Sequence, residues 1–458
     1  MCERVTTQKN RAAVCKHTVE MLDVAERRIT IPLLAVALLS LVQSKMIEIG
    51  EYLKGVFCLV GQTQSGKTQL YKMFFDWLFG RQTDTNFEST DKGIIRVTSK
   101  KRDSVATVDD YKPTSTVFAR NNQMSKLEKI IRICSDDSNG YHRAGYGNLT
   151  IANIAYCILA ITAEEIRLAV QSTLARMLII YITRKSMNWD NLTYCQKNHD
   201  SYKKFIINYI LYISAQGVAN YCDNLKQKFL QNRDKLRSIL LEKNKDIMID
   251  NRTSDQCTWL YISFDLFINY ALEVNAINHD EAKRFKQESL QIFLNIMEEQ
   301  AERINELDDV KQFFRGLSYL LDTKEEHIDK LQARNIKFAS EDSKAAIGFA
   351  KSERIYLKNE VAFRAVNSYF KRFGKDLVIS ESSLRERLFD NGLLVRSKGK
   401  PKSSIHRLYV NGENYQCIVF EKEIFDKLLK GDRKDEARSD EEIQSIRFMR
   451  RNADEATR

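Results

Sequence analysis

The segment GQTQSGKT at residues 61–68 constrains the fold of this chain more than any other feature. It has the spacing GxxxxGK[ST], with an apolar run at residues 56–60 before it and a stretch at 69–78 that we expect to be helical after it. Glycines at this spacing let the backbone curl so that successive N–H groups face one anion, and the following helix adds its dipole. The sequence therefore predicts a strand, a phosphate-binding loop and a helix, which is the arrangement of a P-loop NTPase.

The predicted loop assigns nucleotide contacts to nine consecutive residues. They are Gly61, Gln62, Thr63, Gln64, Ser65, Gly66, Lys67, Thr68 and Gln69. We expect Lys67 to reach the β- and γ-phosphates and Thr68 to ligate magnesium. ATP and Mg²⁺ are therefore the cofactors that this segment predicts.

A second apolar run, at residues 104–108, ends in two carboxylates, Asp109 and Asp110. A P-loop site requires an acidic residue at the end of a neighbouring strand, and Asp109 fits that role as a magnesium partner through water. Asp110 is placed to orient or deprotonate the attacking water. Alternatively, the pair is only a turn, and many related ATPases carry glutamate at the second position.

Two further candidates flank predicted strands. Thr162 follows the apolar run at 158–161 and either positions the attacking water or caps the next helix. Arg176 follows a predicted helix at 166–175 and precedes a strand at 177–182, so we expect it to project into the ATP site of a neighbouring subunit. The alternative is a solvated surface arginine, and Arg167 is a weaker candidate for the same role.

A glycine-rich stretch at residues 139–147 carries Tyr141, His142 and Arg143. Aromatic rings that stack on bases and cations that bind phosphates are typical of single-stranded nucleic acid sites. The stretch is therefore a candidate DNA-binding loop, and the alternative is a plain surface turn.

The net charge and the cysteines indicate what kind of molecule the protein binds and in which cellular compartment it works. The net charge is +11, which indicates either a solvated surface or an anionic partner such as nucleic acid. The nine cysteines include no CxxC pair, which favours a reducing cytoplasm and argues against a zinc site. The longest apolar run near the N-terminus, at 31–42, is shorter than the ~20 residues that a bilayer requires, so we expect a cytoplasmic protein without a membrane partner.

The order of predicted elements divides the chain into five parts. Strands alternate with helices from about 51 to 185, which indicates a parallel α/β sheet, and helical periodicity dominates the next segment. The predicted parts are a helical lead-in at 1–50, an α/β P-loop core at 51–190, a helical region at 191–345, a winged-helix domain at 346–430 and a disordered charged tail at 431–458.

The winged-helix prediction rests on two helices followed by a ribbon. The helices are expected at 360–373 and from a cap at Ser380 or Ser382 to Asn391, and the strands at 393–395, 405–410 and 415–420. Basic residues cluster around the expected wing and are candidate DNA contacts: Arg396, Lys398, Lys400, Lys402 and Arg407. Winged helices also serve as protein-packing modules, so this alternative remains.

Several short motifs together resemble one family, the AAA+ helicases of phages, plasmids and mobile genomic islands, including self-loading helicases of staphylococcal cassette and pathogenicity islands. The matching motifs are PLL at 32–34, GQTQSGKT, WLFG at 77–80, FEST at 87–90, Asp109-Asp110 followed by Pro113, TAEE at 162–165, ARML at 175–178, IGF at 347–349 and IYL at 355–357. One departure is the absence of the family's acidic residue after the Gly-Phe connector, where Ala350 and Lys351 stand instead.

The resemblance implies an AAA+ core, a homo-hexameric ring and translocation on single-stranded or forked DNA. It also implies that Arg176 is the arginine finger and that the 139–147 stretch is the pore-facing hairpin. A primase or polymerase, if needed, is expected from another chain. Our leading hypothesis is an ATPase that drives a DNA helicase for replication of a mobile element, and the alternative is an ATP-switched DNA-binding initiator or regulator that does not unwind. A P-loop metabolic kinase is disfavoured because no small-substrate lid is evident.

Overall fold

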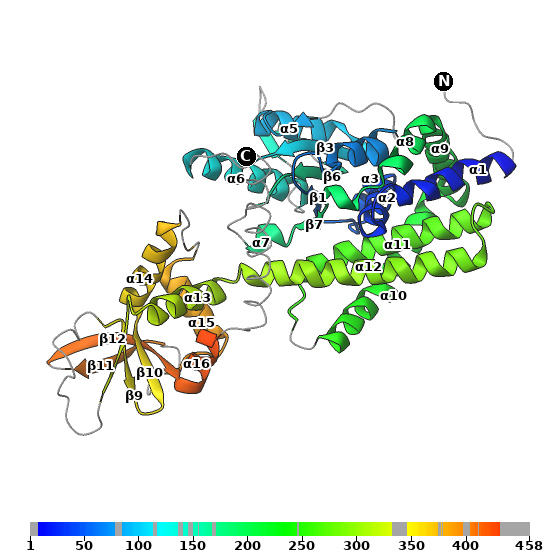
Figure 1. Ribbon diagram of the computed structural model, residues 1–458. Helices are drawn as coiled ribbons and strands as arrows, with labels where there is room; N and C mark the ends of the chain where they lie inside the picture. The colour runs from blue at the N-terminus through cyan, green and yellow to red at the C-terminus, as the bar shows by residue number, and fades with distance from the viewer. Residues whose placement is uncertain are drawn as a thin grey trace, which may run out of the picture. The chain divides into compact units, whose positions relative to one another are not determined.

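The computed structural model describes thirteen stretches of the chain (Figure 1). They are residues 8–77, 85–112, 117–135, 141–144, 150–153, 155–166, 171–244, 247–331, 346–373, 377, 379–396, 404–410 and 412–430. Contacts divide the chain into two compact units, Met1–Asn305 and Glu306–Arg458. The five-part division predicted from the sequence is finer, and its boundaries stay predictions.

A parallel five-stranded sheet forms the centre of the first unit, in the order β2-β3-β6-β1-β7. Its strands are β1 (Val56–Val60), β2 (Thr85–Asn86), β3 (Arg102–Tyr111), β6 (Tyr156–Ala163) and β7 (Met177–Tyr181). The four predicted strands are confirmed, and the parallel α/β P-loop core with them. Because all strands are parallel, their carboxyl ends lie at one edge of the sheet, with the fully buried β1 between β6 and β7.

The N-terminal helices belong to the core of the first unit. They are α1 (Gln8–Glu20), η1 (Met21–Val24), α2 (Arg27–Ser40) and α3 (Gln43–Glu48). The helical prediction for this stretch is confirmed, and α2 is buried from Ile29 to Ser40. The apolar run at 31–42 therefore packs inside the protein, and none of the described helices combines the length and apolar character of a bilayer span.

Long helices follow the sheet and pack on the same hydrophobic cluster. They are α8 (Trp189–Lys197), α9 (His199–Gln216), α10 (Val218–Lys243), α11 (Asn251–Glu273) and α12 (His279–Glu306). In Figure 1, α11 and α12 run alongside each other. The ring centroids of Phe264 in α11 and Phe285 in α12 lie 6.4 Å apart. Phe229 of α10 stacks on Trp259 of α11 at 4.1 Å between ring centroids. The predicted helical periodicity thus reflects faces that build one core with the sheet.

The second unit is a mixed sheet with helices, in strand order β11-β12-β10-β9-β8. Its elements are α13 (Asp309–Asp322), β8 (Ile328–Lys330), β9 (Gly348–Lys351), β10 (Arg354–Lys358), α14 (Asn359–Arg372), α15 (Glu381–Asp390), β11 (His406–Val410), β12 (Glu413–Glu421) and α16 (Lys422–Lys430). Phe314 of α13 packs edge-on against Phe420 and Phe425. These aromatic contacts join the first helix of the unit to its last strand and last helix.

The start of α15 and the segment that follows this helix were both predicted from the sequence. Of the two predicted caps, Ser380 is the one that caps α15, by accepting a hydrogen bond from the Ser383 N–H. The predicted strand at 393–395 is wrong, because Gly392 at φ +69° ends the helix and the Leu393 N–H donates back to the Leu388 carbonyl. The tail at 431–458 lies outside the described residues.

Candidate nucleotide-binding site

Close approaches of the backbone require both glycines of the P-loop. A Cβ on Gly61 would lie 2.2 Å from the Ile182 carbonyl oxygen, just beyond β7. Gly66 has φ +95° and ends the loop before α4 (Lys67–Tyr71), and a Cβ there would lie 2.8 Å from the Met187 sulfur. Glycine alone therefore lets the loop sit against the segment that follows β7.

The helix after the loop differs from the single α-helix predicted at 69–78. After α4 the backbone continues as a π-helical turn, Lys72–Trp77, in which Met73, Phe74 and Phe75 are all fully buried. The helical path is confirmed, but its α character ends at Tyr71, and Leu78 lies outside the described residues.

Lys67 is folded into its own loop. Its ammonium group donates to the carbonyls of Gly61 and Gln62, the second at 2.9 Å, and the residue is 9% exposed. Burial lowers the pKa of Lys67, and the carboxylates of Glu164 and Asp109 act in the opposite direction. The Ser65 hydroxyl is buried beside it with no hydrogen-bond partner among the residues that the structure describes. An ammonium and an unpaired hydroxyl at one loop fit an anionic ligand with several oxygens.

The magnesium candidates meet at the carboxyl edge of the sheet. The Thr68 hydroxyl lies 3.3 Å from the Asp109 carboxylate, which also accepts a hydrogen bond from the Thr162 hydroxyl. The Asp110 N–H donates to the same Thr162 oxygen at 2.9 Å. A hydroxyl and a carboxylate oxygen are ligands that Mg²⁺ prefers, so these residues fit the ion. Thr162 joins both aspartates instead of standing apart as a helix cap.

Two charged residues that the sequence did not single out as site residues, Lys112 and Glu164, join Asp110. The Lys112 ammonium lies 3.1 Å from the Asp110 carboxylate and 3.8 Å from that of Glu164. The hydrogen bond with Asp110 raises the pKa of Lys112. Glu164 also accepts a hydrogen bond from the Thr63 hydroxyl of the P-loop. Glu164 directly follows β6, so the rule that sites form at the carboxyl ends of parallel strands could have identified it.

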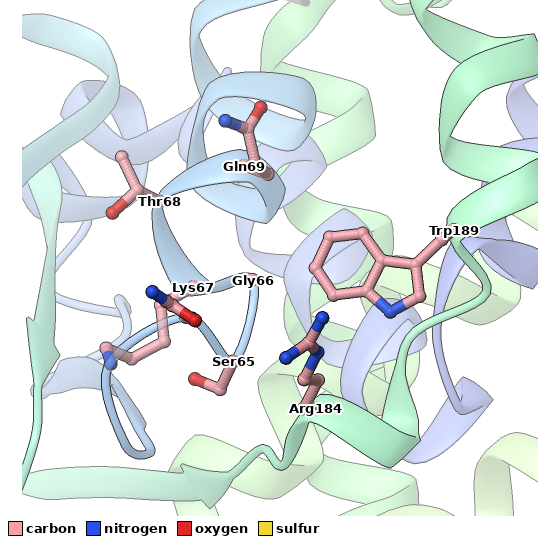
Figure 2. Close-up of a pocket in the computed structure, with 8 residues that line it drawn as sticks. Ser65, Gly66, Lys67, Thr68, Gln69, Arg184 and Trp189 are labelled. Atoms are coloured by element: carbon pink, nitrogen blue, oxygen red, sulfur yellow. The ribbon is translucent and has the colours of Figure 1, made fainter.

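A cavity of about 360 Å³ opens at the P-loop (Figure 2). Residues of the P-loop from Gln64 to Gln69 line it, together with Arg184 and Trp189. Arg184 begins a short 3₁₀ turn, η3 (Arg184–Ser186), after β7, and Trp189 begins α8. Neither was among the predicted site residues, although Arg184 also lies just beyond the carboxyl end of a central strand.

Arg176 lies at the opposite edge of the sheet. Its carbonyl accepts from the Val56 N–H at the start of β1, whereas the P-loop follows the end of that strand. The guanidinium donates to the Ser172 carbonyl in α7 (Gln171–Leu174), and the residue is 8% exposed. Arg176 is therefore not brought to the P-loop of its own chain, and its role at a neighbour's site stays a prediction. Arg167 lies outside the described residues.

The glycine-rich stretch contributes one strand of a hairpin. β4 (Tyr141–Ala144) pairs antiparallel with β5 (Thr150–Asn153), so this part is extended instead of an open loop. The side chains of Tyr141, His142 and Arg143 lie outside the described part of the chain, as do the connecting residues 145–149.

The wing candidates are described only in part. Lys398, Lys400 and Lys402 lie outside the described residues. Arg396 has its guanidinium carbon 5.8 Å from the centre of the Phe389 ring, and Arg407 is exposed on β11 opposite Gln416 of β12. Tyr409, two residues along the same strand, is 65% exposed. The described face of this hairpin thus carries an arginine and an aromatic ring.

The fold and the site define an α/β P-loop protein. No protein-family model and no curated protein matches the chain. Among solved structures, the active helicase Cch of SCCmec type IV is similar over 93% of this chain and 73% of its own, with a TM-score of 0.55 and 13% identity. An inhibitor-bound JCV helicase aligns with 56% of this chain and 73% of its own at a TM-score of 0.25 and 12% identity. The resemblance to helicases of mobile elements is thereby confirmed at the level of the fold.

Proposed function

We propose that the chain is an ATP-dependent, ring-forming DNA helicase that serves replication of a mobile genetic element. The observation that carries this proposal is the contact of Thr68 with Asp109 beside Lys67, at the carboxyl edge of a β2-β3-β6-β1-β7 sheet. The shared fold with an active helicase supports the step from ATPase to helicase.

Each residue of the site has a distinct proposed role in hydrolysis. Lys67 binds the β- and γ-phosphates, and Thr68 with Asp109 would hold Mg²⁺, which would supply positive charge against the charge that develops on the phosphates. Asp110 orients the attacking water, and Thr162 fixes both aspartates through its hydroxyl. Lys112 must release Asp110 before that carboxylate can contact the water, because the two side chains form an ion pair at 3.1 Å.

The ring is proposed from the position of Arg176. An arginine at the amino edge of the sheet cannot serve its own P-loop, so it supports a shared site in a homo-hexamer of the AAA+ type. We further propose that such a ring works in the cytoplasm, with any primase or polymerase supplied by another chain.

DNA contact is proposed for the hairpin of the first unit and the wing of the second. The second unit follows the order α13, β8, β9, β10, α14, α15, β11, β12, α16, and β12 lies between β10 and β11. This order of helices and strands supports a winged-helix domain. The proposed DNA-binding residues are Tyr141, His142, Arg143, Arg396, Lys398, Lys400, Lys402 and Arg407.

Strand displacement tests the proposal. Wild-type protein with ATP and Mg²⁺ is expected to separate a forked duplex and to form a nucleotide-dependent ring detectable by particle mass. Hydrolysis without unwinding at any oligomeric state would contradict the helicase. A footprint confined to one duplex sequence, with hydrolysis indifferent to single-stranded DNA, would favour the ATP-switched initiator instead.

Replacing Thr162 with valine is expected to raise the Mg²⁺ concentration for half-maximal hydrolysis by about tenfold, because outer-shell partners orient metal-binding carboxylates. A magnesium titration of ATPase activity measures this effect. The control is Thr258→Val, which removes a buried hydroxyl that bonds to the Ser254 carbonyl in α11, away from the site. Equal magnesium requirements for both variants would exclude the proposed role of Thr162.

Replacing Arg407 with alanine is expected to weaken DNA binding for all sequences alike. The variant should lose about one phosphate contact. The slope of log K against log salt should therefore become shallower by roughly 0.7–0.9. The matched control is Arg354→Ala, because Arg354 on the same sheet is paired with Glu421 at 3.0 Å. Binding measured at several salt concentrations distinguishes them, and an unchanged slope for Arg407→Ala contradicts the contact.

A further inference from the structure

The far wall of the P-loop cavity has no part in the roles described so far. It is built by the segment between β7 and α8, which carries Arg184 and Trp189. Figure 2 shows the Arg184 guanidinium reaching toward Ser65 and Gly66, with the Trp189 indole beside it. Both side chains therefore face the loop that would hold the phosphates.

Backbone hydrogen bonds fix this segment on the first unit. The Ser186 carbonyl accepts from the Glu26 N–H at 2.9 Å, and the Asn188 N–H donates to the Val24 carbonyl at 2.8 Å. The Asn188 side chain also caps α8 by accepting from the Asn191 N–H at 3.1 Å. The wall is thus a preformed surface and not a loose loop, as a binding site requires.

Arg184 is an uncompensated cation. It is exposed, and its guanidinium has neither an ion pair nor a hydrogen bond among the described residues. By contrast, nearby Arg28 is paired with Glu26 at 2.8 Å. A free guanidinium that points at a phosphate-binding loop fits a phosphate oxygen.

Trp189 offers a large flat ring at the mouth of the same cavity. The residue is 41% exposed although it is an aromatic residue at the start of a helix whose Leu192 and Cys195 are buried. A nucleobase is flat and can stack on an indole, which removes apolar surface from water on both sides. The volume of about 360 Å³ lies within the usual range for small-molecule sites.

We propose that Trp189 stacks on the base of the bound nucleotide and that Arg184 binds the phosphate nearest that base. This inference rests on the proposed ATP binding and extends it from the phosphate end to the base end of the site. The P-loop then holds the terminal phosphates, and the wall after β7 selects nucleotides over other polyphosphates.

Binding of ATP and of inorganic tripolyphosphate, each with Mg²⁺, tests the inference in the full-length protein. Trp189→Ala is expected to raise the Kd for ATP about tenfold and to leave that for tripolyphosphate unchanged, since only ATP carries a base. Trp189→Phe should stay close to wild type. Arg184→Ala should weaken both ligands, because both have a phosphate at that position. The control is Tyr194→Ala, which removes an aromatic residue of equal exposure, 42%, from the same helix outside the cavity.

Tryptophan fluorescence supplies a second readout. The chain has three tryptophans, and Trp259 is 2% exposed, so quenching by ATP that disappears in Trp189→Phe would locate the base at Trp189. Equal ATP affinity of Trp189→Ala and wild type would overturn the inference and leave the proposed ATPase intact. Failure of wild-type protein to bind ATP would overturn both.

Discussion

Replacing Lys67 with alanine is expected to lower the rate of ATP hydrolysis by about 10²- to 10³-fold, because the ammonium stabilises charge that develops on the transferred phosphoryl group. Among the residues that the structure describes, Lys67 is the one lysine that lines the cavity at the P-loop. A steady-state ATPase assay at saturating magnesium measures the effect.

Loss of activity in this variant should not reflect loss of the fold. The Lys67 ammonium donates to carbonyls of its own loop, and water can take over those bonds in the space that the shorter side chain leaves. Thermal unfolding should therefore stay close to wild type. Lys72→Ala is the matched control, since Lys72 is an exposed lysine one turn further along the same helical path. Hydrolysis by Lys67→Ala at the rate of Lys72→Ala would exclude the assigned role.

The sequence predicted the phosphate end of the site because its signals are local. The GxxxxGK[ST] spacing and the apolar runs before Gly61 and Asp109 each lie within a few residues of the groups they place. Parallel pairing of β1 with β6, and of β6 with β3, then brings Thr68, Asp109 and Thr162 together. Strand order itself was not predicted, and it is what makes these three residues neighbours.

The base end of the site could not be predicted in the same way. Arg184 and Trp189 reach the P-loop because the chain leaves β7 at the same edge and is tied to Val24 and Glu26, more than 150 residues earlier. No pattern of neighbouring residues in the sequence predicts this contact between distant segments. The strand wrongly predicted at 393–395 has a different cause, because the adjacent Gly392 ends α15 and outweighs a short apolar run.

Replacing Arg176 with alanine is expected to lower hydrolysis by about 10³- to 10⁵-fold, as for other arginines that stabilise phosphoryl transfer from a neighbouring subunit. In the isolated chain the guanidinium donates to the Ser172 carbonyl. Giving up a hydrogen bond of a charged group costs about 1.5–3 kcal/mol, which is less than the stabilisation that a 10³- to 10⁵-fold effect on the rate represents. Arg176 can therefore turn toward a neighbour's phosphate once a ring forms.

Mixing variants tests whether Arg176 acts between subunits. An Arg176→Ala subunit keeps an intact P-loop, and a Lys67→Ala subunit keeps an intact arginine. In a ring assembled from equal amounts of both, about one interface in four pairs the two intact parts, so activity should return to roughly a quarter of wild type. The control replaces Lys67→Ala with the double variant Lys67→Ala/Arg176→Ala, which has no arginine to donate and should restore nothing. If the first mixture stays as inactive as the second, Arg176 does not complete a neighbour's site, and its burial beside Ser172 is then its structural role.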